Sequence, residues 1–429
     1  MADLSEDEDG EEAVVWGSAY PPSINAGIPK LGALPAGWSR LRMKDMLDVI
    51  ERPVKLDDSK CYRLVTAKRS RGGIVSRGTL RGDEIKVKQQ FEVRAGDFIL
   101  SNRQIAHGGC GIVPPELDGA VVSGEYTVLH PKPLLNLRFL HYLSHSAHFQ
   151  QICFHSGVGV HVEKLVFRLH DWLNWQFDIP SLPEQRRIAE ILSDFDRAID
   201  ATNVLVETKQ RRKRALMQRI FATSSEQSGA LPNGWTRKRI DQVAKTYAGG
   251  TPDRTVPAYF GGTIPWVKSG EVVGVVSSTE EFLSDTGLKQ SSAKLVPAGA
   301  TLIAMYGANA GNVGHLQIGA ATNQAVLAVI PKTGEIDTDF LNFACQVITQ
   351  DLLKKAHGSG QPNLSASMIK EQLIVVPPRA DQSALASVLV DVDRSATIAS
   401  EMSELLVRQR RSLMHRLLTP SQNQKALAA

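Results

Sequence analysis

Two halves of this chain repeat each other at a constant offset of 197 residues. The segment Leu34–Trp38 (LPAGW) returns as Leu231–Trp235 (LPNGW). Aligned without gaps, residues 182–221 and 379–418 share 12 identities over 40 positions, well above chance. A repeat of this length is too long for the unit of a solenoid. It has the size of one domain plus one long helix, so it predicts a tandem duplication of such a module.

The charge of the chain is unevenly distributed. Its 429 residues predict two or three domains, each large enough for its own core. The formal net charge is +4, but residues 1–12 carry seven acids and no base, so the rest of the chain carries +11. We expect the acidic leader to be disordered. The basic remainder permits a polyanionic partner without identifying one.

Cysteine spacing and hydropathy predict a cytoplasmic protein without metal or membrane. The four cysteines are scattered, and neither a Cys-x-x-Cys pair nor a Cys/His cluster indicates zinc or a disulfide framework. Apolar runs stay shorter than the roughly 18–20 residues of a membrane span. The N-terminus is acidic, unlike the start of a secretory signal.

Each half has two textures. The first, over about 38–180 and 235–377, is glycine-rich and predicts short strands near 98–100, 120–122, 126–129, 301–305 and 325–330. Within it, apolar periodicity predicts a helix near 136–150 and another near 338–355.

The second texture is a long helix without internal glycine or proline, over about 184–221 and again over 381–418. Pro183 and Glu184 suit a helix N-terminus. Apolar residues then recur with a heptad-like spacing that the second copy repeats. Two long helices with matching seams predict a coiled coil, antiparallel if the halves are related by a pseudo-two-fold axis. The alternative is two amphipathic helices that each lie on their own domain.

Several motifs make the chain resemble the specificity (S) subunit of type I restriction–modification systems. They are the two Leu-Pro-x-Gly-Trp openings, the run Ile179–Ala189 (IPSLPEQRRIA) with its looser copy Val376–Ala386 (VPPRADQSALA), and, in the second half, Tyr247–Pro252 (YAGGTP), Ile264–Glu271 (IPWVKSGE), Ala304–Gly307 (AMYG) and Thr322–Ala325 (TNQA). The first half lacks the Gly-Gly-Thr-Pro and Pro-Trp-x-x-x-x-Glu elements. It carries Ala95–Ser101 and Leu117–Ser123 instead, which resemble a different branch of the same domain.

The resemblance implies an α+β fold with two pseudo-symmetric α/β target-recognition domains joined by two long antiparallel coiled-coil helices. We therefore expect the following segments: an acidic leader (1–30), target-recognition domain 1 (31–181), spacer helix 1 (182–222), a linker (223–234), target-recognition domain 2 (235–378), spacer helix 2 (379–420) and a tail (421–429).

The resemblance also implies a function. Each domain would read half of a bipartite target in double-stranded DNA, and the chain would have no catalytic residue, cofactor or metal of its own. It would recruit two methyltransferase (M) subunits, which methylate adenine with S-adenosylmethionine, and endonuclease/translocase (R) subunits that use ATP.

Residue chemistry nominates candidate DNA contacts on turn-like segments. Arg and Lys pair with guanine, and Asn and Gln with adenine, while further contacts go to phosphate. The candidates in the first domain are Lys68, Arg69, Arg71, Arg77, Arg81, Asn102, Arg103 and Gln104. Those in the second are Arg254, Trp266, Lys268, Ser269, Tyr306, Asn309, Asn312, Asn323, Gln324, Gln361 and Asn363.

Two further features have competing explanations. The amides of Gly307, Gly311 and Gly314 could approach phosphate, or these glycines could serve turn chemistry alone. The basic cluster at 209–219, with a copy at 408–416, is either a solvated helix face near a C-terminus or a contact to phosphate or a partner subunit.

Catalytic classes fit poorly. The chain lacks the Asn/Asp-Pro-Pro-aromatic loop of an adenine methyltransferase and a Gly-x-x-x-x-Gly-Lys-Ser/Thr phosphate loop. Asp83-Glu84-Ile85-Lys86 has the residue types of a nuclease site, but so short a pattern is common by chance. A remaining alternative is a solitary DNA-binding regulator or antirestriction-like protein on the same fold.

Overall fold

The computed structural model describes residues 29–158, 166–221, 231–356 and 363–418. The chain divides into two compact units, unit 1 (residues 1–202 with 402–429) and unit 2 (residues 203–401). Almost all of the predicted acidic leader, most of the linker and the tail lie outside the described residues. The described part contains no helix that is both long and apolar enough to cross a membrane.

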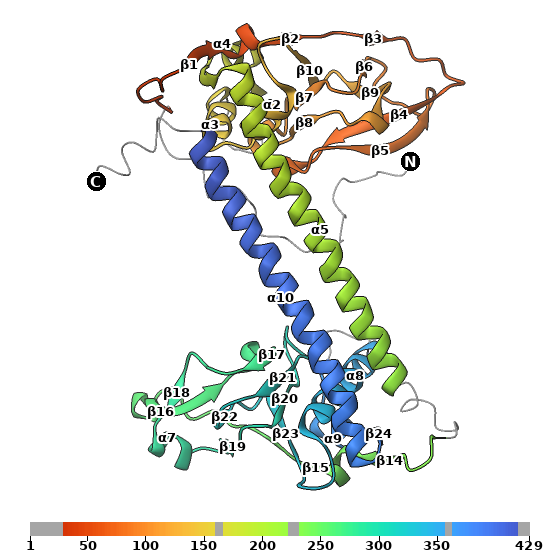
Figure 1. Ribbon diagram of the computed structural model, residues 1–429, viewed down its shortest axis with the longest axis vertical. Helices are drawn as coiled ribbons and strands as arrows, with labels where there is room; N and C mark the ends of the chain where they lie inside the picture. The colour runs from red at the N-terminus through yellow and green to blue at the C-terminus, as the bar shows by residue number, and fades with distance from the viewer. Residues whose placement is uncertain (1–28, 159–165, 222–230, 357–362, 419–429) are drawn as a thin grey trace. The chain divides into compact units, whose positions relative to one another are not determined.

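Unit 1 is built on two sheets (Figure 1). The four-stranded sheet has the order β2 (Leu47–Val49), β10 (Tyr126–Pro131), β7 (Phe98–Ser101), β8 (Cys110–Ile112). The five-stranded sheet has the order β3 (Pro53–Val54), β6 (Gln90–Val93), β9 (Ala120–Ser123), β4 (Cys61–Ala67), β5 (Ile74–Arg81). Smaller pairs join β1 (Trp38–Arg42) to β13 (Gln176–Pro180) and β11 (Gly157–Val158) to β12 (Val166–Phe167). The strands predicted near 98–100, 120–122 and 126–129 are confirmed.

An aromatic core holds unit 1 together beside its helices α1 (Met43–Met46), α2 (Leu137–Ser144), α3 (Ala147–His155) and α4 (Leu169–Asn174). The ring of Phe149 meets that of Trp172 edge-on at 5.7 Å and that of Phe98 at 6.4 Å. All three side chains are fully buried, so each contributes a large apolar area to the hydrophobic stabilisation of this unit.

One expected helix is two. The periodicity over 136–150 predicts a single helix, but the helix is interrupted between α2 and α3. There the Ser146 hydroxyl accepts a hydrogen bond from the backbone N–H of Phe149 at 3.2 Å. A serine at this position caps a new helix start. The counterpart in unit 2, α8 (Thr338–Ala356), is continuous, as predicted.

Unit 2 also contains two sheets. The five-stranded sheet has the order β15 (Ala244–Ala248), β23 (Val326–Pro331), β20 (Thr301–Ala304), β21 (Val313–Leu316), β17 (Gly274–Val276). The four-stranded sheet has the order β18 (Phe282–Leu283), β16 (Phe260–Val267), β22 (Ala320–Thr322), β19 (Leu295–Val296). The remaining elements are the pair β14 (Thr236–Arg239) and β24 (Leu373–Val376), with helices α6 (Ile240–Val243), α7 (Asp285–Lys289) and α9 (Ala366–Lys370). The predicted strands near 301–305 and 325–330 are confirmed.

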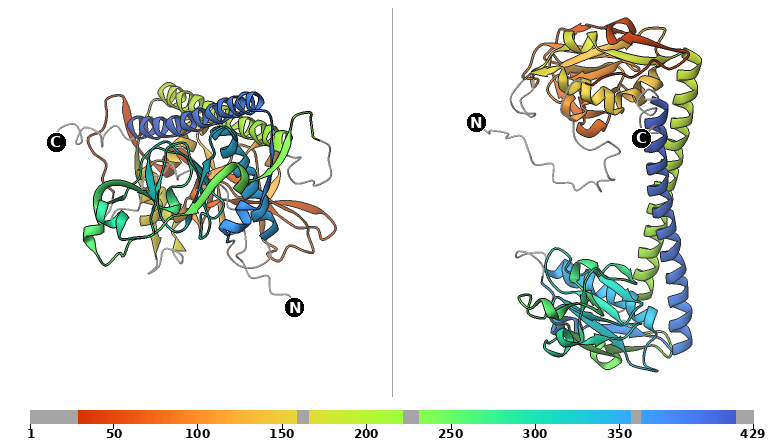
Figure 2. Two further views of the ribbon diagram at one scale, coloured as in Figure 1. Left: turned by 90° about the horizontal axis from the view of Figure 1, so that it is seen from below. Right: turned by 90° about the vertical axis from the view of Figure 1, so that its left-hand side faces the viewer.

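The two long helices are α5 (Leu182–Phe221) and α10 (Arg379–Leu418), and each contributes residues to both units. In unit 1, Ile188 and Leu192 of α5 share a core with Met414 and Leu418 of α10. In unit 2, Met217 and Phe221 of α5 share a core with Ala386 and Leu389 of α10. Within each unit, the segments of α5 and α10 lie side by side (Figure 2). The alternative, in which each helix packs only on its own domain, is therefore wrong.

Two ion pairs show the relative direction of the helices. In unit 1 the guanidinium of Arg410 bonds the carboxylate of Asp196, and in unit 2 Lys213 Nζ lies 2.7 Å from Asp393 Oδ1. In each unit, a residue from the first half of one helix pairs with a residue from the second half of the other, as in an antiparallel pair. The two pairs are copies of each other, because Asp196 and Asp393, like Lys213 and Arg410, are 197 residues apart.

A buried glutamine near the start of each long helix ties the helix to its unit. Gln185 Oε1 accepts from the backbone N–H of Asn136 at 2.8 Å, and its Nε2 donates to the carbonyls of Leu134 and Pro180 at 3.0 Å. Its repeat partner Gln382 accepts from the N–H of Asp337 at 2.7 Å and donates to the carbonyl of Pro377 at 2.8 Å. Buried amides cost free energy unless they are paired. The repeated Glu/Asp-Gln motif therefore has a structural role.

Candidate nucleic-acid interface

In unit 1, a strained turn presents two of the candidate cations. Residues 68–73 join β4 to β5, and Ser70 and Arg71 adopt left-handed backbone angles, with φ of 54° and 60°. Lys68 and Arg69 are exposed on this turn. Arg69 Nε donates to Gln104 Oε1 at 2.9 Å, which brings together candidates 35 residues apart. Non-glycine residues in this conformation persist where the surroundings over-determine it, often at binding sites.

Arg71 is buried and forms hydrogen bonds that support this turn. Its side chain is only 8% exposed. Its Nε donates to the carbonyl of Ser144 at 3.0 Å, and its backbone N–H donates to the carbonyl of Gly108 at 3.2 Å. The sequence-based assignment of Arg71 as a DNA contact does not fit this burial, so we reassign it to support of the turn.

The other candidates of unit 1 lie in varied settings. Arg77 is exposed on β5, and Arg81 lies at its end with Nε 3.3 Å from Asp83 Oδ1. Arg103 is 74% exposed, with Nη2 2.6 Å from Glu125 Oε1. Asn102 is half-buried, and its Oδ1 accepts from the hydroxyl of Thr127 at 2.9 Å. Arg77, Arg81 and Arg103 remain predictions as DNA contacts, whereas Asn102 already serves the fold.

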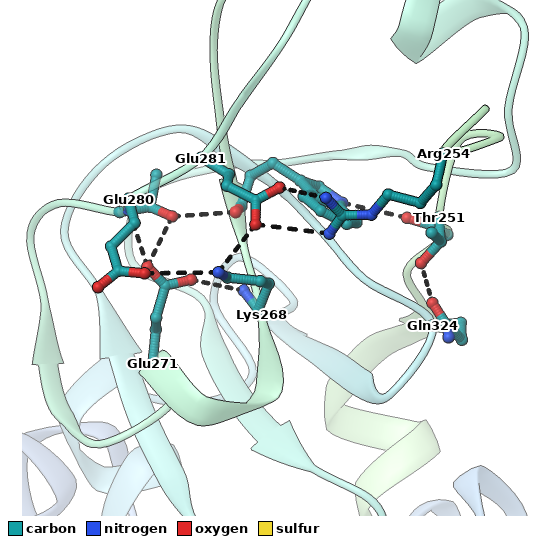
Figure 3. Close-up of polar contacts among 10 residues, drawn as sticks. Thr251, Arg254, Lys268, Glu271, Glu280, Glu281 and Gln324 are labelled. Atoms are coloured by element: carbon teal, nitrogen blue, oxygen red, sulfur yellow. Dashed lines mark hydrogen bonds and ion pairs between the residues drawn. The ribbon is translucent and has the colours of Figure 1, made fainter. Parts of the chain in front are cut away.

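In unit 2, a network of carboxylates surrounds the candidate cations (Figure 3). Arg254 Nη1 lies 2.7 Å from Glu281 Oε2, and Lys268 Nζ lies 2.9 Å from Glu281 Oε1 and 3.5 Å from Glu280 Oε2. The hydrogen bond to Glu281 raises the pKa of Lys268 above its ordinary value. The hydrogen bond from Lys268, followed by that from Arg254, lowers the pKa of Glu281. Both groups therefore stay charged near neutral pH.

Glu271 organises the turn on which Lys268 sits. Its Oε2 accepts from the backbone N–H of Lys268 at 2.8 Å, and its Oε1 accepts from the hydroxyl of Thr279 at 2.9 Å and from the N–H of Glu280 at 2.8 Å. The glutamate of the Pro-Trp-x-x-x-x-Glu motif thus brings residues 279–281 next to Lys268. Ser269 lies half-buried in the same turn.

Trp266 is a structural residue. It is 1% exposed and donates from Nε1 to the carbonyl of Gly250 at 3.1 Å. A Cβ on Gly250 would lie 2.3 Å from the backbone nitrogen of Ala293, and one on Gly249 would lie 2.1 Å from the carbonyl oxygen of Thr322. The Gly-Gly-Thr-Pro motif therefore allows backbones to pack closely, and the prediction that Trp266 touches DNA does not fit its burial. Its exposed neighbour Arg254 places its guanidinium carbon 4.9 Å from the ring centres of Trp266 and Phe260.

Further candidates of unit 2 gather near this network. Gln324 is hydrogen-bonded to Thr251, which connects the glycine-rich segment to the TNQA motif. Asn309 Nδ2 lies 3.7 Å from where a Cβ on Gly270 would stand. Tyr306 and Asn363 are exposed, while Asn312 and Asn323 are half-buried. Gln361 lies outside the described residues.

The glycines near Tyr306 support turn chemistry. Gly307 and Gly311 have φ of 85° and 87°, which favours glycine. The N–H of Gly311 donates to the carbonyl of Ala304 at 2.8 Å, so it is not available to a phosphate. A Cβ on Gly314 would lie 2.9 Å from a methyl group of Val276, a packing reason for that glycine.

The repeated basic cluster on the long helices serves helix pairing in part. Lys213 and its copy Arg410 form the ion pairs described above, and Lys213 also lies 5.6 Å from the ring centre of Phe343. Arg211 pairs with Glu207 one turn earlier on α5, at 3.1 Å. No group of three or more His, Cys, Asp or Glu side chains suited to hold a metal occurs in the described ranges.

The family profile described as "Type I restriction modification DNA specificity domain" matches residues 35–208 and again 232–406. This chain belongs to that family. The MjaIX specificity subunit of Methanocaldococcus jannaschii is 27% identical over 184 residues, which cover 42% of each chain, so the alignment spans less than half of that relative. The putative MjaX specificity subunit of the same organism is 20% identical over 410 residues, covering 91% of this chain and 95% of the relative.

Solved structures of the specificity family share the fold. The S subunit of the type I system from M. genitalium matches 92% of this chain and 98% of its own, with a TM-score of 0.58 at 15% identity. The α+β class with two repeated modules and two long helices, predicted from sequence, is confirmed.

Three residues of the unit 2 site could not be predicted from the sequence. Glu280, Glu281 and Phe260 contact the candidate cations but were not among the nominated residues. Glu281 lies 13 positions after Lys268 and 27 after Arg254. Charge pairs so far apart along the chain require the tertiary fold to be known.

Proposed function

We propose that this chain is the DNA-recognition subunit of a type I restriction–modification complex. Unit 1 and unit 2 would each read one half of a bipartite target, and the chain itself would carry out no chemistry. Methylation would be performed by two methyltransferase subunits, and translocation with cleavage by endonuclease subunits. We expect it to act in the cytoplasm, where the DNA is.

The observation that carries this proposal is the reciprocal construction of the two units. Both use the same buried glutamine, Gln185 or Gln382, and the same type of ion pair, while the turns that carry the candidate cations, 68–73 and 268–271, differ in sequence. Equal scaffolds with unequal loops are what two different half-sites separated by a fixed number of base pairs require. Rigid spacing between two readers translates into half-site spacing on the DNA.

Family membership and the exposed side chains support the nature of the ligand. Lys68, Arg69 and Arg103 in unit 1 are exposed donors on turns, as are Arg254 and Gln324 in unit 2. Such residues supply bidentate base contacts and phosphate contacts.

The test is methylation profiling of the source genome by single-molecule sequencing. We expect a bipartite methyladenine motif that disappears on deletion of this gene and returns with the wild-type copy. Complementation with Arg69→Ala should impair methylation of targets through one half-site, by about 1–3 kcal/mol for a base-edge contact. A matched control is Arg94→Ala, an exposed arginine of unit 1 that pairs with Glu92 at 2.9 Å and is not among the candidates. A methylome unchanged by the deletion would contradict the proposal.

A further inference from the structure

The cations of the unit 2 site are more than balanced by their own carboxylates. Arg254 and Lys268 carry two positive charges, and Glu271, Glu280 and Glu281 carry three negative ones within the same hydrogen-bonded network (Figure 3). A patch that neutralised phosphates would need uncompensated cations. The local charge therefore opposes attraction of this site to the DNA backbone.

Arg254 contacts this network on two sides. The carboxylate of Glu281 accepts hydrogen bonds from the two terminal nitrogens of Arg254 at 2.7 and 3.5 Å. The guanidinium carbon of Arg254 lies 4.9 Å from two aromatic ring centres. A guanidinium already fixed in place loses little conformational freedom when it meets a base edge. A base edge carries no net charge and offers donors as well as acceptors, so the carboxylate does not repel it as it repels phosphate.

We propose that Glu281 is a specificity-determining residue. It neutralises Arg254 and Lys268 against the phosphates of unrelated DNA and positions Arg254 for a base edge of the correct half-site. This inference rests on the proposed function. It assigns to Glu281 a part in the rejection of wrong sequences, because discrimination can arise from an element that weakens the wrong complex.

The contacts of Glu281 predict an unusual phenotype for Glu281→Gln. The variant keeps the size of the side chain and a hydrogen-bond acceptor. It removes the carboxylate that pairs with Arg254, leaves Lys268 with Glu280 at 3.5 Å, and raises the net charge of the network by one. Binding to unrelated DNA should therefore become tighter. Each added phosphate contact should also steepen the dependence of log affinity on log salt by about 0.9. Binding to the target should not improve in proportion, because Arg254 loses its fixed position.

A matched control exists in the same unit. Glu335 pairs at 2.6 Å with Lys238 of β14 on the surface, and neither residue is among the candidates. Glu335→Gln changes the net charge by the same amount and frees one lysine. If the effect of Glu281→Gln were only one of overall charge, the two variants would behave alike. Glu281→Asp keeps the charge and should restore most of the discrimination.

The experiment uses the purified full-length chain. A duplex selected by the wild-type protein from a randomised pool is compared with a scrambled duplex of the same composition, by fluorescence anisotropy at several salt concentrations. For Glu281→Gln we expect the ratio of target to scrambled affinity to fall about tenfold at low salt, with a steeper salt slope for the scrambled duplex. Glu335→Gln should change the ratio less than about twofold, as expected for charge alone. Equal thermal melting of the variants would show that they are folded.

Three outcomes would overturn the inference: an unchanged ratio, the same change in Glu335→Gln, or a loss of target affinity without tighter binding to the scrambled duplex. Failure of the proposed function looks different. In that case the wild-type chain itself would select no sequence from the pool.

Discussion

Units 1 and 2 solve the same problem, the presentation of charged side chains, by different means. In unit 1 a strained turn at Ser70 and Arg71 is anchored from below by a buried guanidinium. In unit 2 an ordinary turn at 269–271 is surrounded by carboxylates and aromatic rings. Both units share the repeated long helices and the buried glutamine, although their sheets differ in the number of strands. The long helices and the buried Gln185 and Gln382 therefore repeat where they tie each helix to its unit, whereas the turns that carry the candidate cations differ.

Replacement of the buried glutamines Gln185 and Gln382 should give the largest effects on stability. Gln185→Ala removes three buried hydrogen bonds in unit 1 and Gln382→Ala two in unit 2, so we expect losses of about 3 and 2 kcal/mol in the affected unit. Hydrogen exchange measured on peptides from 137–155 and 338–356 reports on the two units separately. The exposed Gln350→Ala is the control. An equal loss of protection in both units from either variant would contradict the assignment of each glutamine to its own unit.

Acid should lower the stability of unit 1 more than that of unit 2, with the next largest effect. Burial lowers the pKa of His141 and His148 and lowers that of His145 further, so these rings are neutral in the folded state. An unfolded histidine titrates near 6.5. Below that pH the unfolded state binds more protons, and stability is lost as the pH falls, while above about pH 7 it stays constant.

The readout of this acid effect is exchange protection of 137–155 between pH 7.5 and 5, corrected for intrinsic rates. The segment 338–356, which has no histidine, is the internal reference. His145→Gln should flatten the profile. Equal loss of protection in both segments would refute the assignment.

The strained turn should give the smallest change in stability, and with opposite sign. Ser70→Gly relieves a left-handed conformation that costs about 1–2 kcal/mol, so unit 1 should become more stable by about 1 kcal/mol. Ser70→Ala also removes the hydroxyl but keeps the strain, and should give no gain. Because the glycine loosens the turn, methylation at the unit 1 half-site should weaken. A stabilised variant with full recognition would show that the strain has no role in presentation.

The sequence predicts the long helices and the repeated domains, but it does not predict which residues surround the candidate site. Heptad spacing over 184–221 and its repeat predicted the long helices, because periodicity is a local property of the chain. The sequence pattern does not distinguish the buried Trp266 and Arg71 from their exposed neighbours, because a residue of a motif can serve packing as well as binding. The partnership of Glu281 with Arg254 depends on how β16 and the segment after Glu271 fold together. The break at Ser146 was hidden because apolar residues continue on both sides of it.

The copied ion pairs have an implication for how such chains diversify. Each long helix carries an aspartate and, 17 positions later, a cation: Asp196 with Lys213, and Asp393 with Arg410. When two such helices pair antiparallel, the aspartate of each helix therefore lies beside the cation of the other. A module could pair with a copy of itself or with a module from a related gene and still satisfy both charges. Exchange of halves by recombination would leave the helix seam intact while it changed the loops. New combinations of half-sites are then accessible in one genetic step.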